Sequence, residues 1–137
     1  MVSKIDHIGI AVNKIDEQLP YYRDILGLKI EKIETVESEG VKVCFIKVGD
    51  THIELLEPIA DTSPIKKFLE KNGPGVHHIA YVSDDIIKEI SKVKDNKLQL
   101  INERPKLGAG GKQICFLHPR STFGVLTEIC QTTEEVH

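Results

Sequence analysis

The sequence lacks the features that mark a disulfide-rich, membrane-spanning or nucleic-acid-binding protein. Its three cysteines, Cys44, Cys115 and Cys130, form no CxxC pair and leave an odd count, so buried thiols are expected rather than disulfides or structural zinc. The longest apolar run, Ile8 to Val12, is far shorter than the about 20 residues of a transmembrane helix. Eighteen basic and 21 acidic residues give a formal charge of −3 without a basic stripe, which argues against a nucleic-acid partner.

The N-terminal residues contain no apolar signal core, so a cytoplasmic location is expected. A length of 137 residues, with 40% hydrophobic and 28% charged residues, is typical of one globular domain.

An internal repeat organises the residues that are present. At an offset of 71 residues, Asp6 to Val12 matches His77 to Ser83, and Val43 to Ile46 matches Ile114 to Leu117. Two distant matches at one offset predict two modules, at about residues 1–62 and 74–137. A connector helix at about residues 63–73, capped by Ser63, is predicted between them.

Each module is predicted to have the order β-α-β-β-β, with strands recognised by alternation and helices by apolar spacing. In the first module Asn13 is expected to cap the helix and Gly27 to end it, and Pro20 either to kink the helix or to move its start to a later residue. In the second module the expected cap is Ser83 or Asp84. The predicted strands are His7–Val12, Leu28–Glu34, Val41–Val48, His52–Leu56, Leu98–Asn102, Gln113–Leu117 and Val125–Cys130.

These elements predict an α+β fold in which two tandem modules form one curved, mixed but mostly antiparallel sheet around a cleft. A three-residue insertion after Cys115 aligns Glu128 with Glu54. Each module therefore carries one histidine on its first strand, His7 or His78, and one glutamate on its last.

Two imidazoles and two carboxylates that face a common cavity suit a divalent first-row metal ion. A single His or Glu on a strand is more often structural, but a repeat that keeps both polar residues on apolar strands favours a metal site.

The other histidines receive different interpretations. His77 is expected to be structural or to support a ligand, because adjacent strand residues point to opposite faces and His78 aligns with His7. His52, directly after a turn, is expected to be exposed. His118 follows a strand, where contact with substrate and a hydrogen bond to the backbone both remain open.

A glycine-rich segment, Lys106 to Lys112, has exposed backbone N–H groups flanked by lysines. It lacks the Walker A and dinucleotide patterns, so a phosphate-holding or lid segment and an ordinary flexible hairpin loop remain alternatives. The candidate substrate-binding residues are Lys106, Gly110, Lys112 and His118.

Five segments resemble the vicinal oxygen chelate superfamily, which includes glyoxalase I, extradiol dioxygenases and bleomycin-resistance proteins, and within it the methylmalonyl-CoA epimerase family. The resemblance covers nearly the whole chain, and the segment that ends at Glu128 is the most specific. The segments are Asp6–Val12, Ile53–Pro58, Ser63–Leu69, Gly75–Ala80 and Phe116–Glu128.

The resemblance implies a glyoxalase-like fold with a metal ion held by His7, Glu54, His78 and Glu128. It implies Co²⁺ as the favoured ion, with Zn²⁺, Ni²⁺ or Mn²⁺ as alternatives, and no other cofactor. The implied reaction interconverts (R)- and (S)-methylmalonyl-CoA by removal of the C2 proton through a metal-stabilised enolate. An acyl-CoA substrate and a homodimer are expected partners, whereas nucleic acid and membrane are not.

Glu128 and Glu54 are the best candidates for proton transfer. Some bacterial epimerases have Gln where this chain has Glu54 and a proposed catalytic Glu where it has Val43. Because Val43 cannot titrate, Glu37 and Glu39 on the preceding turn are held in reserve. Two other functions remain open: a glyoxalase I with the same four ligands, and a non-catalytic binding protein of the bleomycin-resistance type.

Overall fold

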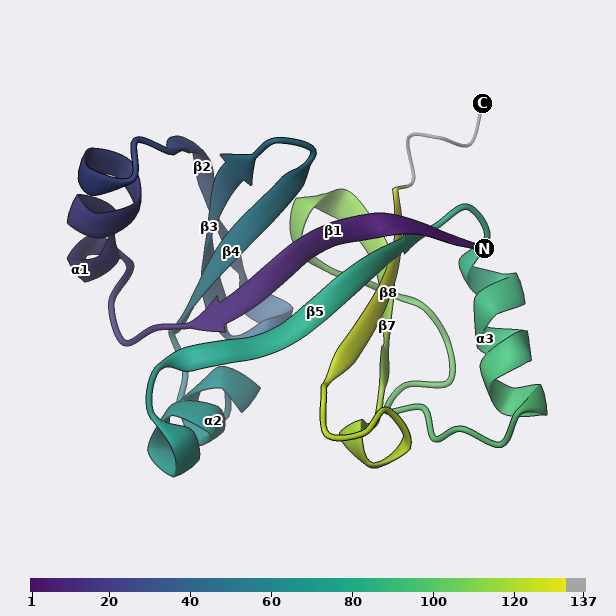
Figure 1. Ribbon diagram of the computed structural model, residues 1–137. Helices are drawn as coiled ribbons and strands as arrows, with labels where there is room; N and C mark the ends of the chain where they lie inside the picture. Colours follow the sequence, from purple (N-terminus) through teal and green to yellow (C-terminus); the bar gives the residue numbers. More distant parts are fainter. Residues whose placement is uncertain (133–137) are drawn as a thin grey trace. The chain divides into compact units, whose positions relative to one another are not determined.

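The structure, a computed structural model, describes residues 1–132. The chain packs as two units, one made of His7–His77 and the other of Met1–Asp6 together with the chain from His78 onward. The predicted module boundaries remain a prediction, and residues 133–137 of the second module lie outside the described residues. Figure 1 labels the elements.

In the first unit the strand order is β2-β3-β4-β1. Strand β3 runs antiparallel to β2 and β4, whereas β4 runs parallel to β1. The predicted order of elements is confirmed, and the bounds of β3 are those expected. The strands are β1 (Val2–Ala11), β2 (Lys29–Val36), β3 (Val41–Val48) and β4 (Thr51–Pro58).

The helical segment of this unit begins later than expected and changes form at Pro20. The N-cap position is Lys14 rather than Asn13, and the amide of Ile15 donates instead to Glu57 Oε1 over 2.7 Å. Helix α1 (Ile15–Leu19) then continues as the π-helix η1 (Pro20–Ile25). Because proline has no N–H to donate within the α-helix, the predicted kink becomes a change of helical pitch.

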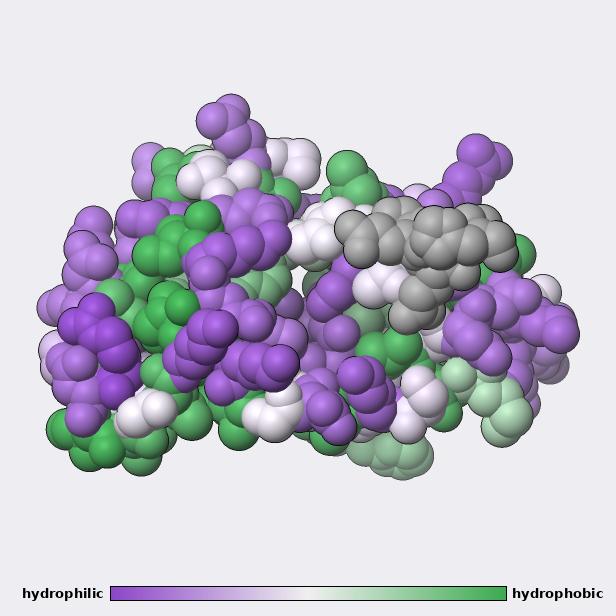
Figure 2. Space-filling model, turned by 90° about the horizontal axis from the view of Figure 1, so that it is seen from above, coloured by the Kyte–Doolittle hydropathy of each residue, from purple (hydrophilic) through white to green (hydrophobic). Residues whose placement is uncertain are grey.

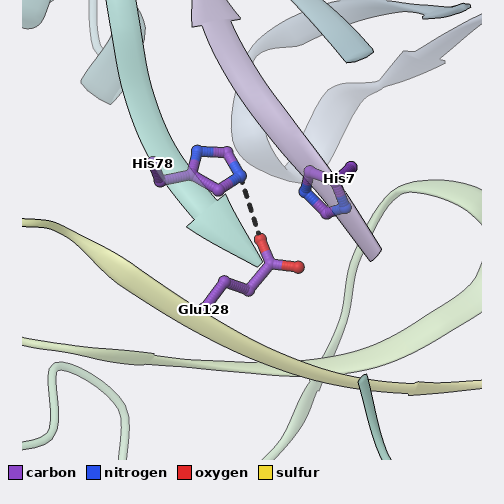
Figure 3. Close-up of side chains that lie close together, drawn as sticks. All are labelled: His7, His78 and Glu128. Carbon is purple, nitrogen blue, oxygen red and sulfur yellow. Dashed lines mark ion pairs between the residues drawn. The ribbon is translucent and has the colours of Figure 1, made fainter. Parts of the chain in front are cut away.

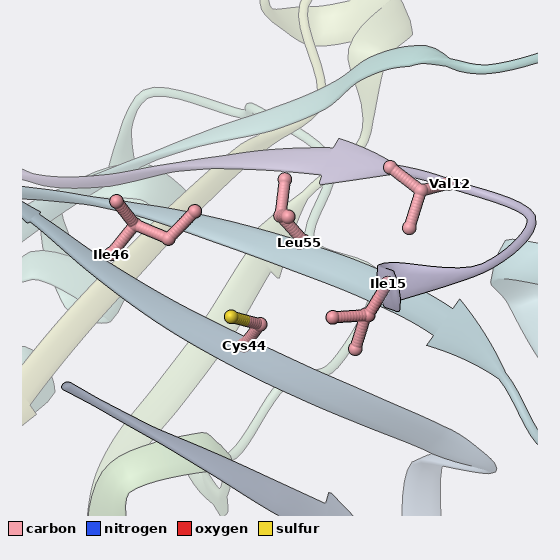
Figure 4. Close-up of a cluster of buried hydrophobic side chains, with 5 residues drawn as sticks. All are labelled: Val12, Ile15, Cys44, Ile46 and Leu55. Atoms are coloured by element: carbon pink, nitrogen blue, oxygen red, sulfur yellow. The ribbon is translucent and has the colours of Figure 1, made fainter. Parts of the chain in front are cut away.

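The core of the first unit lies between α1 and one face of its strands. Five buried side chains meet there, as Figure 4 shows: Val12, Ile15, Cys44, Ile46 and Leu55. Hydrophobic side chains also lie among hydrophilic ones on the surface over the unit that carries α1 (Figure 2), and the exposed residues of η1 include Tyr21 and Ile25.

Helix α2 (Pro64–Asn72) confirms the predicted connector helix. Ser63 is its N-cap, with the hydroxyl oxygen accepting a hydrogen bond from the amide of Ile65 at 3.2 Å, and Pro64 occupies the first helical position. Gly73 ends the helix with a φ of 75°, a backbone conformation that favours glycine.

In the second unit the strand order is β5-β8-β7-β6, with β8 parallel to β5 and antiparallel to β7. Helix α3 (Ile86–Asp95) is capped by Asp85, whose side chain accepts a hydrogen bond from the amide of Lys88. The hydroxyl oxygen of Ser83 accepts a hydrogen bond from the amide of Asp85, so the cap lies one residue beyond the two predicted positions. The strands are β5 (Gly75–Ser83), β6 (Lys106–Leu107), β7 (Lys112–Leu117) and β8 (Thr127–Thr132).

The predicted strand Leu98–Asn102 is wrong. The segment runs beside β7, but it forms only an isolated bridge between Leu100 and Leu117. The side chain of Asn102 takes the place of a backbone acceptor, since its Oδ1 accepts from the amide of Phe116 at 2.8 Å. A side-chain bond of this kind interrupts the regular ladder.

The burial of the cysteines and the lengths of the helices agree with the expectations from the sequence. Cys44, Cys115 and Cys130 are buried thiols, and burial raises the pKa of the Cys115 thiol to about 11. Within residues 1–132, no helix combines the length and the apolar character needed to cross a membrane.

The glycine-rich segment forms the hairpin that joins β6 to β7 through the short helix η3 (Ala109–Gly111). Gly108 packs so closely on Ile114 that a Cβ at position 108 would lie 2.6 Å from Ile114 Cδ1 and 3.0 Å from its Cγ2. The segment is therefore a hairpin, and its role in holding a phosphate or closing over a substrate stays a prediction.

Gly108→Ala is expected to lower the free energy of unfolding by about 1–3 kcal/mol, because the added methyl group overpacks the buried Ile114. Urea unfolding measures this change. Gly75→Ala is the matched control, since a Cβ at Gly75 meets nothing within 4 Å. Equal stability of the two variants would contradict the overpacking.

Candidate functional site

The first unit buries a histidine beside a glutamate. His7 lies on β1 and Glu54 on the neighbouring strand β4. The residue of β1 directly opposite Glu54 is Gly9. His7 Nδ1 lies 3.1 Å from Glu54 Oε2, and each side chain is only 4% exposed. The pair lies on the strand face opposite the core residue Leu55, because neighbouring strand residues alternate between faces.

The second unit contains an equivalent pair, drawn with its ion pair in Figure 3. His78 on β5 and Glu128 on β8 place Nε2 and Oε1 3.2 Å apart, and both side chains are buried. The edge of the His78 ring meets Phe116 at a centroid distance of 5.5 Å. This contact fixes the ring against β7.

The strand registers of the two units confirm the alignment of the two glutamates. Glu54 lies opposite Gly9 on one neighbouring strand and opposite Phe45 on the other. Glu128 lies opposite the repeat-related residues, Ala80 and Phe116. In both units the glutamate therefore has a small residue on one side and a phenylalanine on the other.

Each pair offers an imidazole nitrogen and a carboxylate oxygen to a metal ion. A buried carboxylate requires compensation by a hydrogen bond, a positive charge or a metal. The neighbouring imidazole nitrogen lies 3.1 Å from the carboxylate in the first pair and 3.2 Å in the second, and a divalent cation would supply positive charge to both. The pairs thus have the composition of metal-ligating groups.

Two further histidines have protein partners. His52 Nε2 lies 2.5 Å from Glu31 Oε1, so it is half-buried in an ion pair rather than exposed as expected. This hydrogen bond lowers the pKa of the Glu31 carboxyl. His77 meets the ring of Phe68 edge-on at a centroid distance of 5.1 Å, which agrees with its structural interpretation.

His118 caps the short helix η4 (Pro119–Ser121). Its Nδ1 accepts a hydrogen bond from the amide of Arg120 at 3.0 Å, so the backbone alternative describes this nitrogen. Acceptance at Nδ1 leaves the proton on Nε2 as the donor of the neutral ring.

The glycine-rich hairpin positions its two lysines differently. Lys106 is exposed on β6, whereas Lys112 at the start of β7 is mostly buried and pairs with Asp6. Gly110, with a φ of 73°, forms the turn between them. The sequence interpretation missed Asp6, although a charged residue within an apolar strand is the signal that could have found it.

Val43 is buried on β3, two residues from Phe45, on the strand face that carries Glu54. Of the reserve bases, Glu37 is exposed and Glu39 half-buried in the short helix η2 (Glu37–Glu39). Val43 therefore lies on a strand paired with that of Glu54, whereas the two reserve residues lie in the helix before that strand.

A family model described as the Glyoxalase/Bleomycin resistance protein/Dioxygenase superfamily matches residues 6–116. The matched region contains three of the four residues of the His–Glu pairs, namely His7, Glu54 and His78. The fold and the paired His–Glu sites are thus found in a chain of the glyoxalase class.

Similar proteins narrow this class. Ethylmalonyl-CoA/methylmalonyl-CoA epimerase of Cereibacter sphaeroides is 38% identical over 96% of this chain and 99% of its own. A variant of Streptomyces coelicolor methylmalonyl-CoA epimerase, in complex with 2-nitronate-propionyl-CoA, is 34% identical with a TM-score of 0.94, over 97% of this chain and 96% of its own. A hypothetical protein of Bacillus halodurans C-125 is 48% identical with a TM-score of 0.94, over 98% and 97%.

The chain belongs to the methylmalonyl-CoA epimerase family of the glyoxalase superfamily. The structural similarity over nearly the whole chain confirms the predicted glyoxalase-like fold.

Proposed function

We propose that this protein is an isomerase that interconverts the two C2 epimers of methylmalonyl-CoA. The observation that carries the proposal is the pair of buried His–Glu sites at repeat-related positions in a chain of this family. A similar structure contains methylmalonyl-CoA itself, at 34% identity over 97% of this chain.

The proposed ligands of a divalent metal ion are His7, Glu54, His78 and Glu128. Their chemistry fits such an ion, because each unit supplies one nitrogen and one oxygen donor from buried side chains. A bound divalent ion would supply positive charge near the thioester oxygen, where negative charge develops during reaction.

Epimerisation requires one group to take the C2 proton and a group on the opposite face to return one. Glu128 and Glu54 are the proposed acid–base residues. Burial beside an imidazole excludes water from each carboxylate, which favours direct transfer between the carboxylate oxygen and the substrate carbon. Each glutamate would act as the base for one epimer and as the acid for the other.

The hairpin after Lys106 and the loop at His118 are the proposed contacts of the acyl-CoA substrate. Lys106 is exposed and can meet a phosphate, Gly110 presents backbone without a side chain, and His118 retains a donor at Nε2. Lys112 belongs to the same hairpin, with its ammonium group engaged by Asp6.

Assays with methylmalonyl-CoA and with methylglyoxal plus glutathione test the reaction. We expect the metal-loaded protein to exchange the C2 proton of methylmalonyl-CoA with deuterated solvent, and to form no lactoylglutathione above the uncatalysed rate. Turnover of the hemithioacetal alone would replace the proposal by a glyoxalase I activity. Turnover of neither substrate would favour a binding protein.

Separate measurements test the proposed metal ion, oligomeric state and location. Elemental analysis of the purified protein tests cobalt against zinc, nickel and manganese, and light scattering tests the proposed homodimer. Fractionation of cells that express the protein tests the proposed cytoplasmic location.

A further inference from the structure

A mostly buried ion pair joins the start of β7 to Asp6, in the part of β1 that belongs to the second unit. Lys112 Nζ lies 2.5 Å from Asp6 Oδ2, and the two side chains are 15% and 12% exposed. The residues are 106 positions apart in the sequence. Such a contact makes the position of Asp6 depend on that of the hairpin.

A hydrogen bond and a strand-register partner hold the backbone at Lys112. Its carbonyl oxygen accepts from the amide of Gly108 at 2.9 Å, and its register partner on β8 is Thr132. Gly108 in turn packs against Ile114 without room for a side chain. The ammonium group is therefore carried on a rigid hairpin rather than on a free loop.

Asp6 is the residue directly before His7, a proposed metal ligand. The direction of the His7 side chain depends on the backbone of β1. An anchored Asp6 side chain restrains that backbone at the residue next to His7. A buried ion pair contributes little net stability, since desolvation of both charges offsets their attraction. The contribution of the Asp6–Lys112 ion pair is therefore to the position of the β1 backbone rather than to stability.

We propose that Lys112 is a positioning residue for His7, acting through its ion pair with Asp6. This inference rests on the proposed metal site. It assigns the Lys112 ammonium group to the protein rather than to a phosphate of the substrate, because that group is mostly buried and already paired with a carboxylate.

The test measures Co²⁺ affinity by isothermal titration of the metal-free protein, together with KM for methylmalonyl-CoA. Lys112→Met is expected to weaken Co²⁺ binding about 10–100-fold, the range found when residues that orient metal ligands are removed. Lys112→Arg, which keeps a cation for Asp6, is expected to restore most of the affinity. KM is expected to change little.

Asp6→Asn breaks the same pair from its other side and replaces the first variant if Lys112→Met does not fold. Since both changes remove one interaction, the double variant is expected to bind Co²⁺ no more weakly than the weaker single variant. Lys92→Met is the matched control, because Lys92 also pairs with a mostly buried carboxylate, that of Glu89, at 3.6 Å in the same unit.

The outcomes separate this inference from the proposed function. A parent protein that binds no Co²⁺ would overturn the metal site and the positioning role together. Equal Co²⁺ affinity in the parent and in Lys112→Met would overturn only the positioning role. A higher KM with unchanged Co²⁺ affinity would also overturn it, by assigning Lys112 to the substrate.

Discussion

Glu128→Gln is expected to keep its metal ion while the exchange of the C2 proton with deuterated solvent slows by at least about a hundredfold. The amide oxygen can still ligate a cation, but a neutral amide cannot accept the proton. General acid–base catalysis contributes on the order of 10² to 10⁴ in rate, so the loss of one base lies within this range. Mass spectrometry of the recovered substrate measures the exchange.

Two companion variants complete this experiment. Glu54→Gln is expected to slow exchange in a similar way, because Glu54 occupies the repeat-related position and is equally buried. Glu89→Gln is the control, since Glu89 is a buried glutamate of α3 outside the two pairs. Unchanged exchange in metal-loaded Glu128→Gln would remove Glu128 as a base and turn attention to Glu54, Glu37 and Glu39.

His7→Ala and His78→Ala are each expected to lose nearly all bound metal, with affinity reduced by more than the about 100-fold typical of residues that only support a ligand. Each change removes a nitrogen donor and also leaves the neighbouring glutamate without its imidazole. Elemental analysis after dialysis against Co²⁺ measures the effect.

His77→Ala provides the control for this pair of variants. His77 is next to His78 in the sequence, but it contacts the ring of Phe68. It is expected to keep the metal content of the parent and to lose some thermal stability. Full metal occupancy in both His7→Ala and His78→Ala would contradict the proposed ligand set.

The repeat explains why the two His–Glu pairs could be predicted from the sequence. The offset of 71 residues aligned His7 with His78, and one insertion aligned Glu54 with Glu128. Strand pairing then depends on the same apolar alternation that the sequence displays, so Phe45 and Phe116 take equivalent positions opposite the glutamates.

The errors arose where a side chain replaces a backbone interaction. The amide of Ile15 donates a hydrogen bond to the side chain of Glu57, which lies on the distant strand β4. No local capping pattern encodes this bond. Asn102 likewise bonds to Phe116 and prevents the predicted strand from forming. The pairing of Asp6 with Lys112 joins residues 106 positions apart in the sequence, so local patterns could not reveal it.

The six residues before His7 pack with the unit that begins again at His78, not with the repeat in which they lie. If the repeat arose by gene duplication, the two copies were not free to diverge independently afterwards. A substitution at Asp6 is expected to depend on the residue at position 112, because Lys112 is the ion-pair partner of Asp6. Covariation across homologous genes is therefore expected between the codons for positions 6 and 112.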